Sequence, residues 1–346
     1  MRTTLSMKPT GWFQIGWSST VPAEGVVPLR YFGQDLVAWR DEQQVVHVMD
    51  AYCRHLGANL AYGGTVTATG IQCPFHGWTW GPDGRNVSIP YQDRPNNARR
   101  IRTWHVQEKD DVLFLWHDLH GRDPFYDIPD LLTDVTPHIA GLTFQSPLPD
   151  GTSHYTDTQV HPQYVLENSV DPEHFRFVHG TPLAPVILQQ DVTDTVWHTV
   201  AGFGRRWADG VDRPDDRRNT ITIHSVGIGF AYNAELTPEG WRLMLISTTP
   251  VDDDRTEMFG TYWLEDVPGS TAEDRTRRLD VIKGALPQDI TIWDNQMYLD
   301  PPALATSEAA GFRALRRWST RFYPDAESSP APAAARATDP VLSRGA

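Results

Sequence analysis

The two cysteines of this chain constrain its fold more than any other feature, because each lies beside a histidine. The first pair, Cys53 and His55, reads Cys-x-His, and the second, Cys73 and His76, reads Cys-x-x-His. A chain of 346 residues that keeps only two thiols and places an imidazole near each has the ligand set of a metal site. We therefore predict two loops that meet around metal.

Two kinds of metal centre use two cysteines and two histidines. A structural zinc ion binds them as a tetrahedron, but its finger-like spacings usually pair like residues. In a Rieske 2Fe-2S centre, two thiolates hold one iron and two imidazoles hold the other. The mixed pairs here, separated by residues 56–72, suit two loops that each reach both irons. We predict a 2Fe-2S cluster bound by Cys53, His55, Cys73 and His76, with zinc as the alternative.

The residues around these pairs carry a resemblance to a known family. The sequences HLGA at 55–58 and CPFHGWTW at 73–80 are similar to the two cluster-binding loops of Rieske non-heme iron oxygenases. Gly57 and Gly77 are expected to let backbone amides approach the cluster sulfurs, because hydrogen bonds to sulfur help to set the potential of a cluster. The resemblance implies a Rieske domain in the first third of the chain.

A second group of possible metal ligands consists of Asp171, His174 and His179. On a predicted helix, Asp171 and His174 would lie one turn apart on the same face. His179 would approach His174 if the helix bends or ends between them. Two histidines and a carboxylate form the facial triad that binds non-heme Fe(II) and leaves positions open for dioxygen. On spacing alone, surface or core histidines are the commoner interpretation, but a Rieske cluster makes a second redox metal an expected companion.

The segment also resembles the mononuclear-iron motif of the Rieske oxygenases. The resemblance implies that His174 and His179 bind Fe(II). It assigns Asp171 a different part, as the carboxylate that links His174 to a cluster histidine of a neighbouring subunit and carries the electron between them.

The third iron ligand is then expected to be a carboxylate far downstream. Residues 288–295, with the sequence QDITIWDN, resemble the family segment that supplies it. We select Asp289. Asp294 and Asp300 remain alternatives, because a lone Asp near a helix start is usually a cap.

The length and hydrophobic pattern predict an α+β protein of two domains. Short β-branched and aromatic runs predict a small antiparallel β domain at 10–120, with a hairpin turn at Gly33 and Gln34. A connection rich in Pro and Asp follows at 120–130. Residues 324–346 are rich in Ala, Pro and Ser and are expected to be disordered.

The second domain, at 121–323, is predicted to be the larger α+β unit. By resemblance it is the helix-grip-like catalytic domain, whose strands and late helix are expected to line an apolar substrate pocket. Its strongest elements are β-rich runs followed by stretches of helical periodicity, at 220–232, 240–251, 255–265, 272–285 and 307–322.

Charge and hydropathy exclude two classes of partner. The net charge is −14, from 30 basic and 44 acidic residues, which argues against a nucleic-acid partner. No apolar run reaches the length of a membrane helix, so we expect no membrane partner. Two cysteines kept as thiolate ligands agree with a reducing compartment, and we expect a cytoplasmic protein.

The span from Gly11 to about Asp325 most resembles the 3-ketosteroid 9α-hydroxylase oxygenase branch. Dihydroxylating aromatic dioxygenases commonly carry Asn four residues before the bridging Asp, whereas Glu167 stands there in this chain, which favours monooxygenation. The resemblance implies the oxygenase component of a multicomponent monooxygenase that hydroxylates an apolar, steroid-like polycyclic substrate with O2. It also implies electrons from an NAD(P)H-dependent flavin or iron-sulfur reductase, directly or through a ferredoxin, and a head-to-tail homotrimer.

Three other functions remain open from the sequence. A Rieske oxygenase of specialised metabolism would act on another polycyclic or aromatic substrate, by hydroxylation, desaturation or cyclisation. A Rieske electron carrier would need only the first domain and would leave the second motif without a purpose. A lipid-binding protein with a structural zinc would use the Cys-His pairs only to join two loops.

Overall fold

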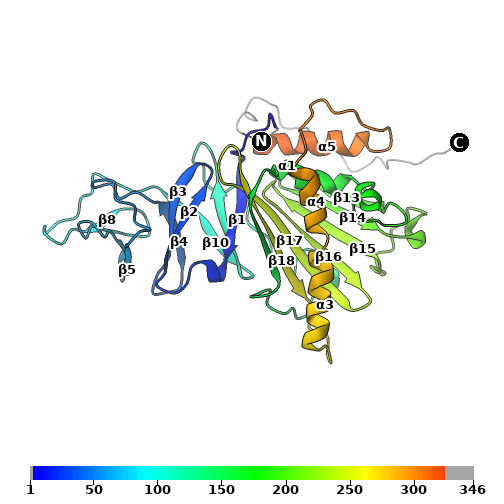
Figure 1. Ribbon diagram of the computed structural model, residues 1–346, viewed down its shortest axis with the longest axis horizontal. Coiled ribbons are helices and arrows are strands. Elements are labelled where there is room, and N and C mark those ends of the chain that lie inside the picture. The colour runs from blue at the N-terminus through cyan, green and yellow to red at the C-terminus, as the bar shows by residue number, and fades with distance from the viewer. Residues whose placement is uncertain (1–2, 324–346) are drawn as a thin grey trace.

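The computed structural model describes residues 3–323 and divides them between small sheets and one large sheet (Figure 1). The large sheet contains seven strands in the order β12-β18-β17-β16-β15-β14-β13, and every neighbouring pair is antiparallel. The predicted α+β class, a small antiparallel β part followed by a larger α+β part, is confirmed. The tail at 324–346, expected to be disordered, lies outside the described residues.

Three small sheets form the N-terminal part of the chain, in the orders β1-β11-β10, β2-β3-β4-β9 and β5-β6-β7-β8. Their strands are β1 Gly11–Trp17, β2 Val26–Tyr31, β3 Gln34–Arg40, β4 Val46–Asp50, β5 Thr65–Thr67, β6 Gly70–Gln72, β7 Thr79–Trp80, β8 Asn86–Ser88, β9 Thr103–Trp104, β10 Val106–Lys109 and β11 Val112–His117.

The hairpin between β2 and β3 differs by one residue from the prediction. Its turn residues are Phe32 and Gly33, with φ angles of 54° and 74°, and Gln34 already pairs with Tyr31 as the first residue of β3. Two successive residues with positive φ are typical of the turn that matches the twist of a two-residue hairpin. The turn is therefore at Phe32 and Gly33, one residue earlier than the predicted Gly33 and Gln34, because Gln34 pairs with Tyr31.

The large sheet and its helices come from the second half of the chain. Its strands are β12 Thr152–Thr158, β13 Val186–Val192, β14 Val196–Gly202, β15 Thr220–Val226, β16 Phe230–Thr237, β17 Gly240–Pro250 and β18 Thr256–Leu264. The helices are α1 Pro162–Glu167, α2 His174–Phe177, α3 Ala272–Lys283, α4 Leu286–Trp293 and α5 Ala309–Ser319. None of the helices within residues 3–323 is long and apolar enough to cross a membrane.

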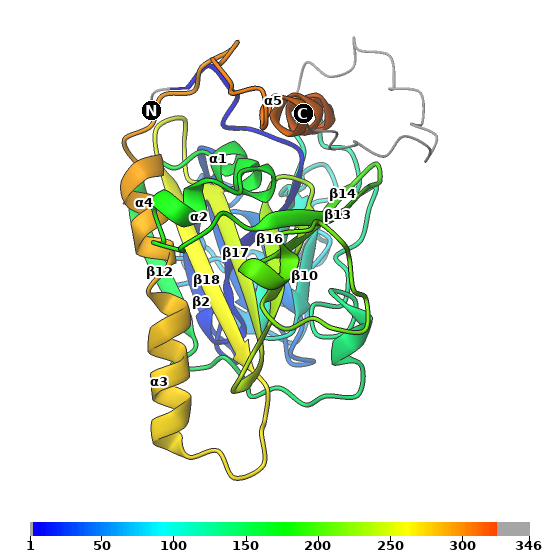
Figure 2. The same ribbon diagram turned by 90° about the vertical axis from the view of Figure 1, so that its right-hand side faces the viewer.

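The two faces of the large sheet have different neighbours, because successive side chains of a strand point to opposite faces. On one face, Phe230 and Tyr232 of β16 join Trp12, Phe114 and Trp116 of β1 and β11 in a buried cluster. On the other face lie the helices α1 to α4 (Figure 2). The first face joins the N-terminal sheets to the large sheet, and the second is left to enclose a site.

An ion pair fixes α5 to the end of α1. Arg316 donates from Nε to Glu167 Oε1 at 2.8 Å and from Nη2 to Oε2 at 3.0 Å, and only 7% of the Glu167 side chain is exposed. Loss of one partner of a buried pair leaves an uncompensated charge, which costs about 3–5 kcal/mol.

We therefore expect Arg316→Met to lower the free energy of unfolding by about 3–5 kcal/mol, measured by denaturant unfolding. A second change, Glu167→Gln, should restore most of this loss because it removes the unpaired charge. Arg317→Ala, in the exposed position next along α5, is the matched control and should change stability by less than about 0.5 kcal/mol. A single Arg316 variant as stable as the control would contradict the prediction.

Candidate metal centres

The two Cys-His loops have the same backbone design. Gly57 N donates to Cys53 O at 2.9 Å, and Gly77 N donates to Cys73 O at 3.0 Å. Both glycines have left-handed φ angles, 81° and 71°, which residues with a Cβ rarely adopt. The amides of the two glycines themselves donate to the cysteine carbonyls and close the turns. The amide that approaches the Cys53 sulfur is that of His55.

The four predicted cluster ligands meet at the tip of these loops. Cys53 and Cys73 are buried and close enough for their thiols to interact, and the rings of His55 and His76 lie 4.7 Å apart. Nδ1 of His76 is buried and has no hydrogen-bond partner among the described residues. Two neighbouring thiols beside two converging imidazoles, one of them with an unsatisfied buried nitrogen, fit the donor set of a Rieske 2Fe-2S cluster.

Two tryptophans enclose this group. Trp78 stacks on His55 with ring centroids 4.5 Å apart and 4° between the planes. Trp80, which is fully buried, donates from Nε1 to Cys53 Sγ at 3.3 Å. Burial raises the pKa of the Cys53 thiol, while the hydrogen bonds from His55 and Trp80 act in the opposite direction by stabilising the thiolate.

Trp80→Phe is expected to make the midpoint potential of the cluster more negative, because a hydrogen bond to a ligand sulfur favours the reduced form. Redox titration followed by visible absorbance measures this shift. Trp39→Phe is the matched control, since Trp39 belongs to the same buried cluster but its indole N–H has no partner among the described residues. An equal potential in the Trp80 variant and the wild type would contradict the prediction.

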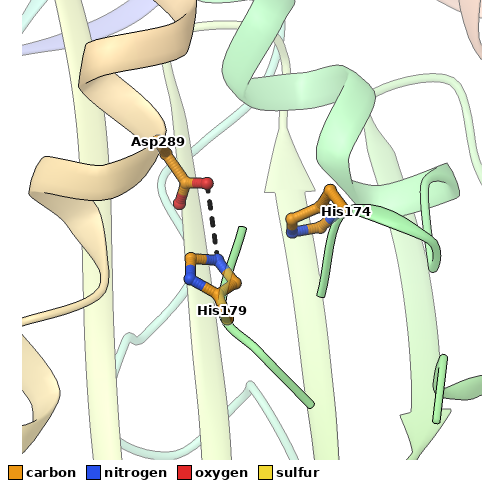
Figure 3. A group of neighbouring side chains, drawn as sticks. All are labelled: His174, His179 and Asp289. Atoms are coloured by element: carbon orange, nitrogen blue, oxygen red, sulfur yellow. Dashed lines mark ion pairs between the residues drawn. The ribbon is translucent and has the colours of Figure 1, made fainter. Parts of the chain in front are cut away.

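The second group of predicted ligands comes together between α2 and α4. Single ligand atoms of His174, His179 and Asp289 all lie within 4.8 Å of one another. Figure 3 shows that Asp289 reaches across from α4 toward His179, with His174 on the other side of the gap. His179 Nε2 and Asp289 Oδ1 are 3.4 Å apart, and the two imidazole rings are 5.4 Å apart.

Hydrogen bonds on the far side of each ring orient the imidazoles. His174 Nδ1 donates to the backbone carbonyl of Asp171, and His179 Nδ1 donates to Gln288 Oε1 at 3.4 Å. Nε2 of His179 is then left with a lone pair on the side of Asp289, and Nε2 of His174 accepts a hydrogen bond from Asn168 Nδ2 at 3.4 Å. This arrangement is the one in which metal-binding histidines are usually held, and with the carboxylate it fits the donor set of non-heme Fe(II).

The pKa values of the two histidines are shifted in opposite directions. Burial lowers the pKa of His174, although Asp171 and Asp289 oppose this effect. The hydrogen bond to Asp289 raises the pKa of His179 against the smaller effect of burial. The carboxylate of Asp289 therefore favours a positive charge on the His179 ring. A cation bound by all three residues would lie between their ligand atoms, next to the same carboxylate.

Asp171 does not lie on a common helix with His174, as the spacing had suggested. The chain passes from α1 through a 3-10 turn at Asn168–Val170, and Pro172 separates Asp171 from α2, which starts at His174. Asp171 Oδ1 accepts a hydrogen bond from the backbone N–H of His174 at 3.3 Å. Its carboxylate is 29% exposed and 4.0 Å from His174 Nδ1. Asp171 thus contacts His174 from the outer side of the ligand group.

The alternatives to Asp289 lie elsewhere. Asp294 follows the end of α4, and its Oδ1 accepts a hydrogen bond from the backbone of Gln159 at 2.5 Å. Neither Asp294 nor Asp300 belongs to the group of metal-ligating atoms found within residues 3–323.

A cavity of about 420 Å³ adjoins the three residues and is roomy enough for a drug-sized ligand. Its walls come from β15, β16, β17, α3 and α4, and most of its side chains are apolar. They include Phe175, Ile223, Met244, Ile282, Leu286 and Trp293.

The strands expected to line this pocket do so in part, since β15, β16 and β17 contribute side chains and β18 does not. Met244 lines the cavity, whereas the aromatic residues of β16 and β18 lie in the sheet core, namely Phe230, Tyr232, Phe259, Tyr262 and Trp263. The residues missed were Asn233, Glu235 and Arg242, which alternate with apolar neighbours along β16 and β17 and could have been found from that alternation.

Comparisons with known proteins place both halves of the chain. Residues 11–106 match the family model for the Rieske [2Fe-2S] domain, and residues 115–323 match that for the 3-ketosteroid 9alpha-hydroxylase C-terminal domain. The chain is a Rieske oxygenase. It belongs to the branch of the 3-ketosteroid 9α-hydroxylase oxygenase components, and its cofactors are the Rieske 2Fe-2S cluster and a mononuclear iron.

Two curated relatives illustrate the branch. This Rieske oxygenase is 30% identical to the oxygenase component of 3-ketosteroid-9-alpha-monooxygenase from Rhodococcus rhodochrous, over 92% of this chain and 80% of the relative. It is 27% identical to a cholesterol 7-desaturase from Bombyx mori, over 91% of this chain and 69% of the relative.

A solved structure supports the fold. Dicamba monooxygenase bound to dicamba superposes with a TM-score of 0.63 at 17% identity, covering 92% of this chain and 98% of that chain. The expectation from sequence that this is a Rieske oxygenase, an oxidoreductase of the monooxygenase type, is confirmed.

Proposed function

We propose that this Rieske oxygenase is the oxygenase component of a multicomponent monooxygenase that hydroxylates a polycyclic, steroid-like substrate. The observation that carries the proposal is the cavity beside His174, His179 and Asp289, which is large, mostly apolar and open to those three ligand atoms. Two curated relatives that cover most of this chain are named for action on steroids.

We assign Cys53, His55, Cys73 and His76 to the cluster, and His174, His179 and Asp289 to the mononuclear Fe(II). When bound there, the cluster would supply electrons one at a time, and the mononuclear iron would provide the site of dioxygen activation. One oxygen atom enters the product and the other leaves as water. The protein holds the ligand atoms in place, and its apolar walls exclude water and orient the substrate.

The electron is proposed to cross between subunits by way of Asp171. The cluster loops lie at one end of the molecule, beside β5 and β8, whereas α4 lies against the large sheet, on the far side of β1 (Figure 1). Exposed apolar side chains occur near both places in the chain, with Leu56, Phe75 and Tyr91 in or shortly after the cluster loops, Phe177 at the end of α2 and Met297 after α4. A head-to-tail homotrimer would cover both and bring one subunit's cluster to the next subunit's Asp171.

The oxygenase component needs a separate electron donor. We propose an NAD(P)H-dependent flavin or iron-sulfur reductase as the electron donor, directly or through a ferredoxin. A cytoplasmic location is supported by two cysteines that both serve as ligands and form no disulfide. We place the Rieske domain at 10–120 and the catalytic domain at 121–323.

The test is turnover with defined compounds. The purified protein, reduced by a surrogate reductase, is incubated with 3-ketosteroids, sterols and unrelated aromatic compounds, and each product is measured by mass spectrometry. A steroid product that has gained one oxygen atom supports the proposal. Turnover of the aromatic compounds alone would reject the steroid-like substrate class.

Desaturation is a second candidate reaction. It is favoured by the similarity to the cholesterol 7-desaturase, which spans both halves of the chain. A product that has lost two hydrogen atoms and gained no oxygen would identify it in the same experiment.

A further inference from the structure

Three neighbouring strands form the floor of the cavity with alternate residues of one face. The strands β15, β16 and β17 pair in register, so their cavity-facing side chains stand in rows across the sheet. One row is Ile223, Asn233 and Met244, and the adjacent row is Ile221, Glu235 and Arg242. A third row is Ser225, Ala231 and Ile246, so polar side chains alternate with apolar ones across the floor.

Two residues of this floor, Ser225 and Asn233, have a buried polar atom without a hydrogen-bond partner among the described residues, and Asn233 lies on the central strand. Only 8% of Asn233 is exposed, and its Oδ1 atom is buried without a hydrogen-bond partner among the described residues. Its cross-strand neighbours, Ile223 and Met244, offer no polar side-chain atom apart from a weakly accepting sulfur. A buried polar atom that finds no partner in the protein costs about 1–3 kcal/mol, and a bound ligand removes that cost.

The adjacent row carries a charge pair that is already balanced. Arg242 donates to Glu235 Oε2 from Nε at 2.9 Å and from Nη2 at 2.5 Å. Both side chains line the cavity and are less than a third exposed. A substrate carboxylate would add an unbalanced negative charge beside Glu235, and an ammonium group would do the same beside Arg242. An uncharged polar group fits next to this pair without that cost.

We propose that Asn233, supported by the Glu235–Arg242 pair, is a specificity-determining anchor for one uncharged polar group of the substrate, a carbonyl or a hydroxyl. This inference rests on the proposed function and narrows its substrate class to neutral polycyclic molecules with such a group. The side-chain amide of Asn233 both donates and accepts hydrogen bonds, so it suits either group. By fixing one end of the molecule, the anchor decides which carbon lies beside His174, His179 and Asp289.

The test compares two ligands that differ by one carbonyl, androstan-3-one and androstane. Their dissociation constants are measured with the intact holoprotein by quenching of tryptophan fluorescence, since Trp293 lines the cavity. In the wild type we expect the ketone to bind about tenfold more tightly, the value of one good hydrogen bond. In Asn233→Leu the ratio should fall to about one, while androstane binds at least as tightly as before.

Met244→Leu is the matched control, because Met244 is the cross-strand neighbour of Asn233 and the change removes no hydrogen-bonding group of comparable strength. It should keep the tenfold ratio. Visible absorbance of the cluster and thermal unfolding check that each variant is folded. The double variant Glu235→Gln with Arg242→Gln provides a second measurement, and a reduced ratio is expected there too.

Two results would overturn the anchor and are distinguishable. If both ligands bind the wild type and the ratio is the same in the Asn233 and Met244 variants, the anchor is wrong while the proposed function stands. If neither ligand binds the wild type, the steroid-like substrate class of the proposed function is wrong, and the anchor fails with it.

Discussion

Asp289→Ala is expected to remove the mononuclear iron, leave the 2Fe-2S cluster in place and reduce turnover to background. Asp289 supplies the carboxylate that lies 3.4 Å from His179 Nε2, and two imidazoles without a carboxylate bind Fe(II) poorly. The cluster residues belong to a different sheet region, so visible absorbance should be unchanged. Metal analysis should find the two irons of the cluster and lose the third.

Asp294→Ala is the matched control, because Asp294 is the next acidic residue along the chain and was itself a candidate ligand. It hydrogen-bonds the backbone of Gln159 and lies outside the ligand group, so all three irons and most of the activity should remain. Full iron content in the Asp289 variant, together with iron loss in the Asp294 variant, would reverse the assignment.

Asp171→Asn is expected to keep both metal centres and yet lower turnover by about 10–100-fold. An amide of the same shape can still accept the hydrogen bond from the His174 backbone, so the ligand loop should keep its form. The amide lacks the negative charge with which a carboxylate orients a histidine and raises its basicity, and loss of such a partner commonly costs 10–100-fold. Steady-state turnover with metal analysis of the same sample measures both expectations.

The step that fails in this variant is also testable. If Asp171 carries electrons between subunits, the cluster should still be reduced by the reductase but should no longer be reoxidised on addition of substrate and dioxygen. Glu173→Gln is the control, since Glu173 is an exposed carboxylate two residues away that pairs with Arg176. Rapid cluster reoxidation in the Asp171 variant would disprove the bridging role.

Much of the fold could be predicted from local pattern. The helices predicted at 272–285 and 307–322 are α3 and α5, because a long run of one periodicity is a strong signal for a helix. The strands β12, β13 and β14 were missed. The strands β12 and β13 contain many polar and partly exposed residues, so neither face of either strand gives a regular hydrophobic signal.

Differences between the predicted and observed strands come from how the strands pair with one another, not from their amino-acid composition. The run at 220–232 was predicted as one strand and is two, since the chain turns back at Gly227 and Gly229 and pairs with itself. The aromatic residues of β16 face the N-terminal sheets rather than the pocket. Which face of a strand meets a cavity depends on the partner that covers the other face, and that partner lies far away in the sequence.

The sequence by itself determined the chemistry of both centres. Two cysteines, each beside a histidine, and two histidines five residues apart limit the possible metals, because donor type and number are covalent properties of the chain. Only the tertiary structure decided that Asp289 rather than Asp294 joins the histidines, and that Asn233 Oδ1 is buried in the cavity floor with no hydrogen-bond partner within residues 3–323. Those facts depend on how α4 and β16 pack against distant segments, and packing of this kind is set by the whole fold rather than by local sequence.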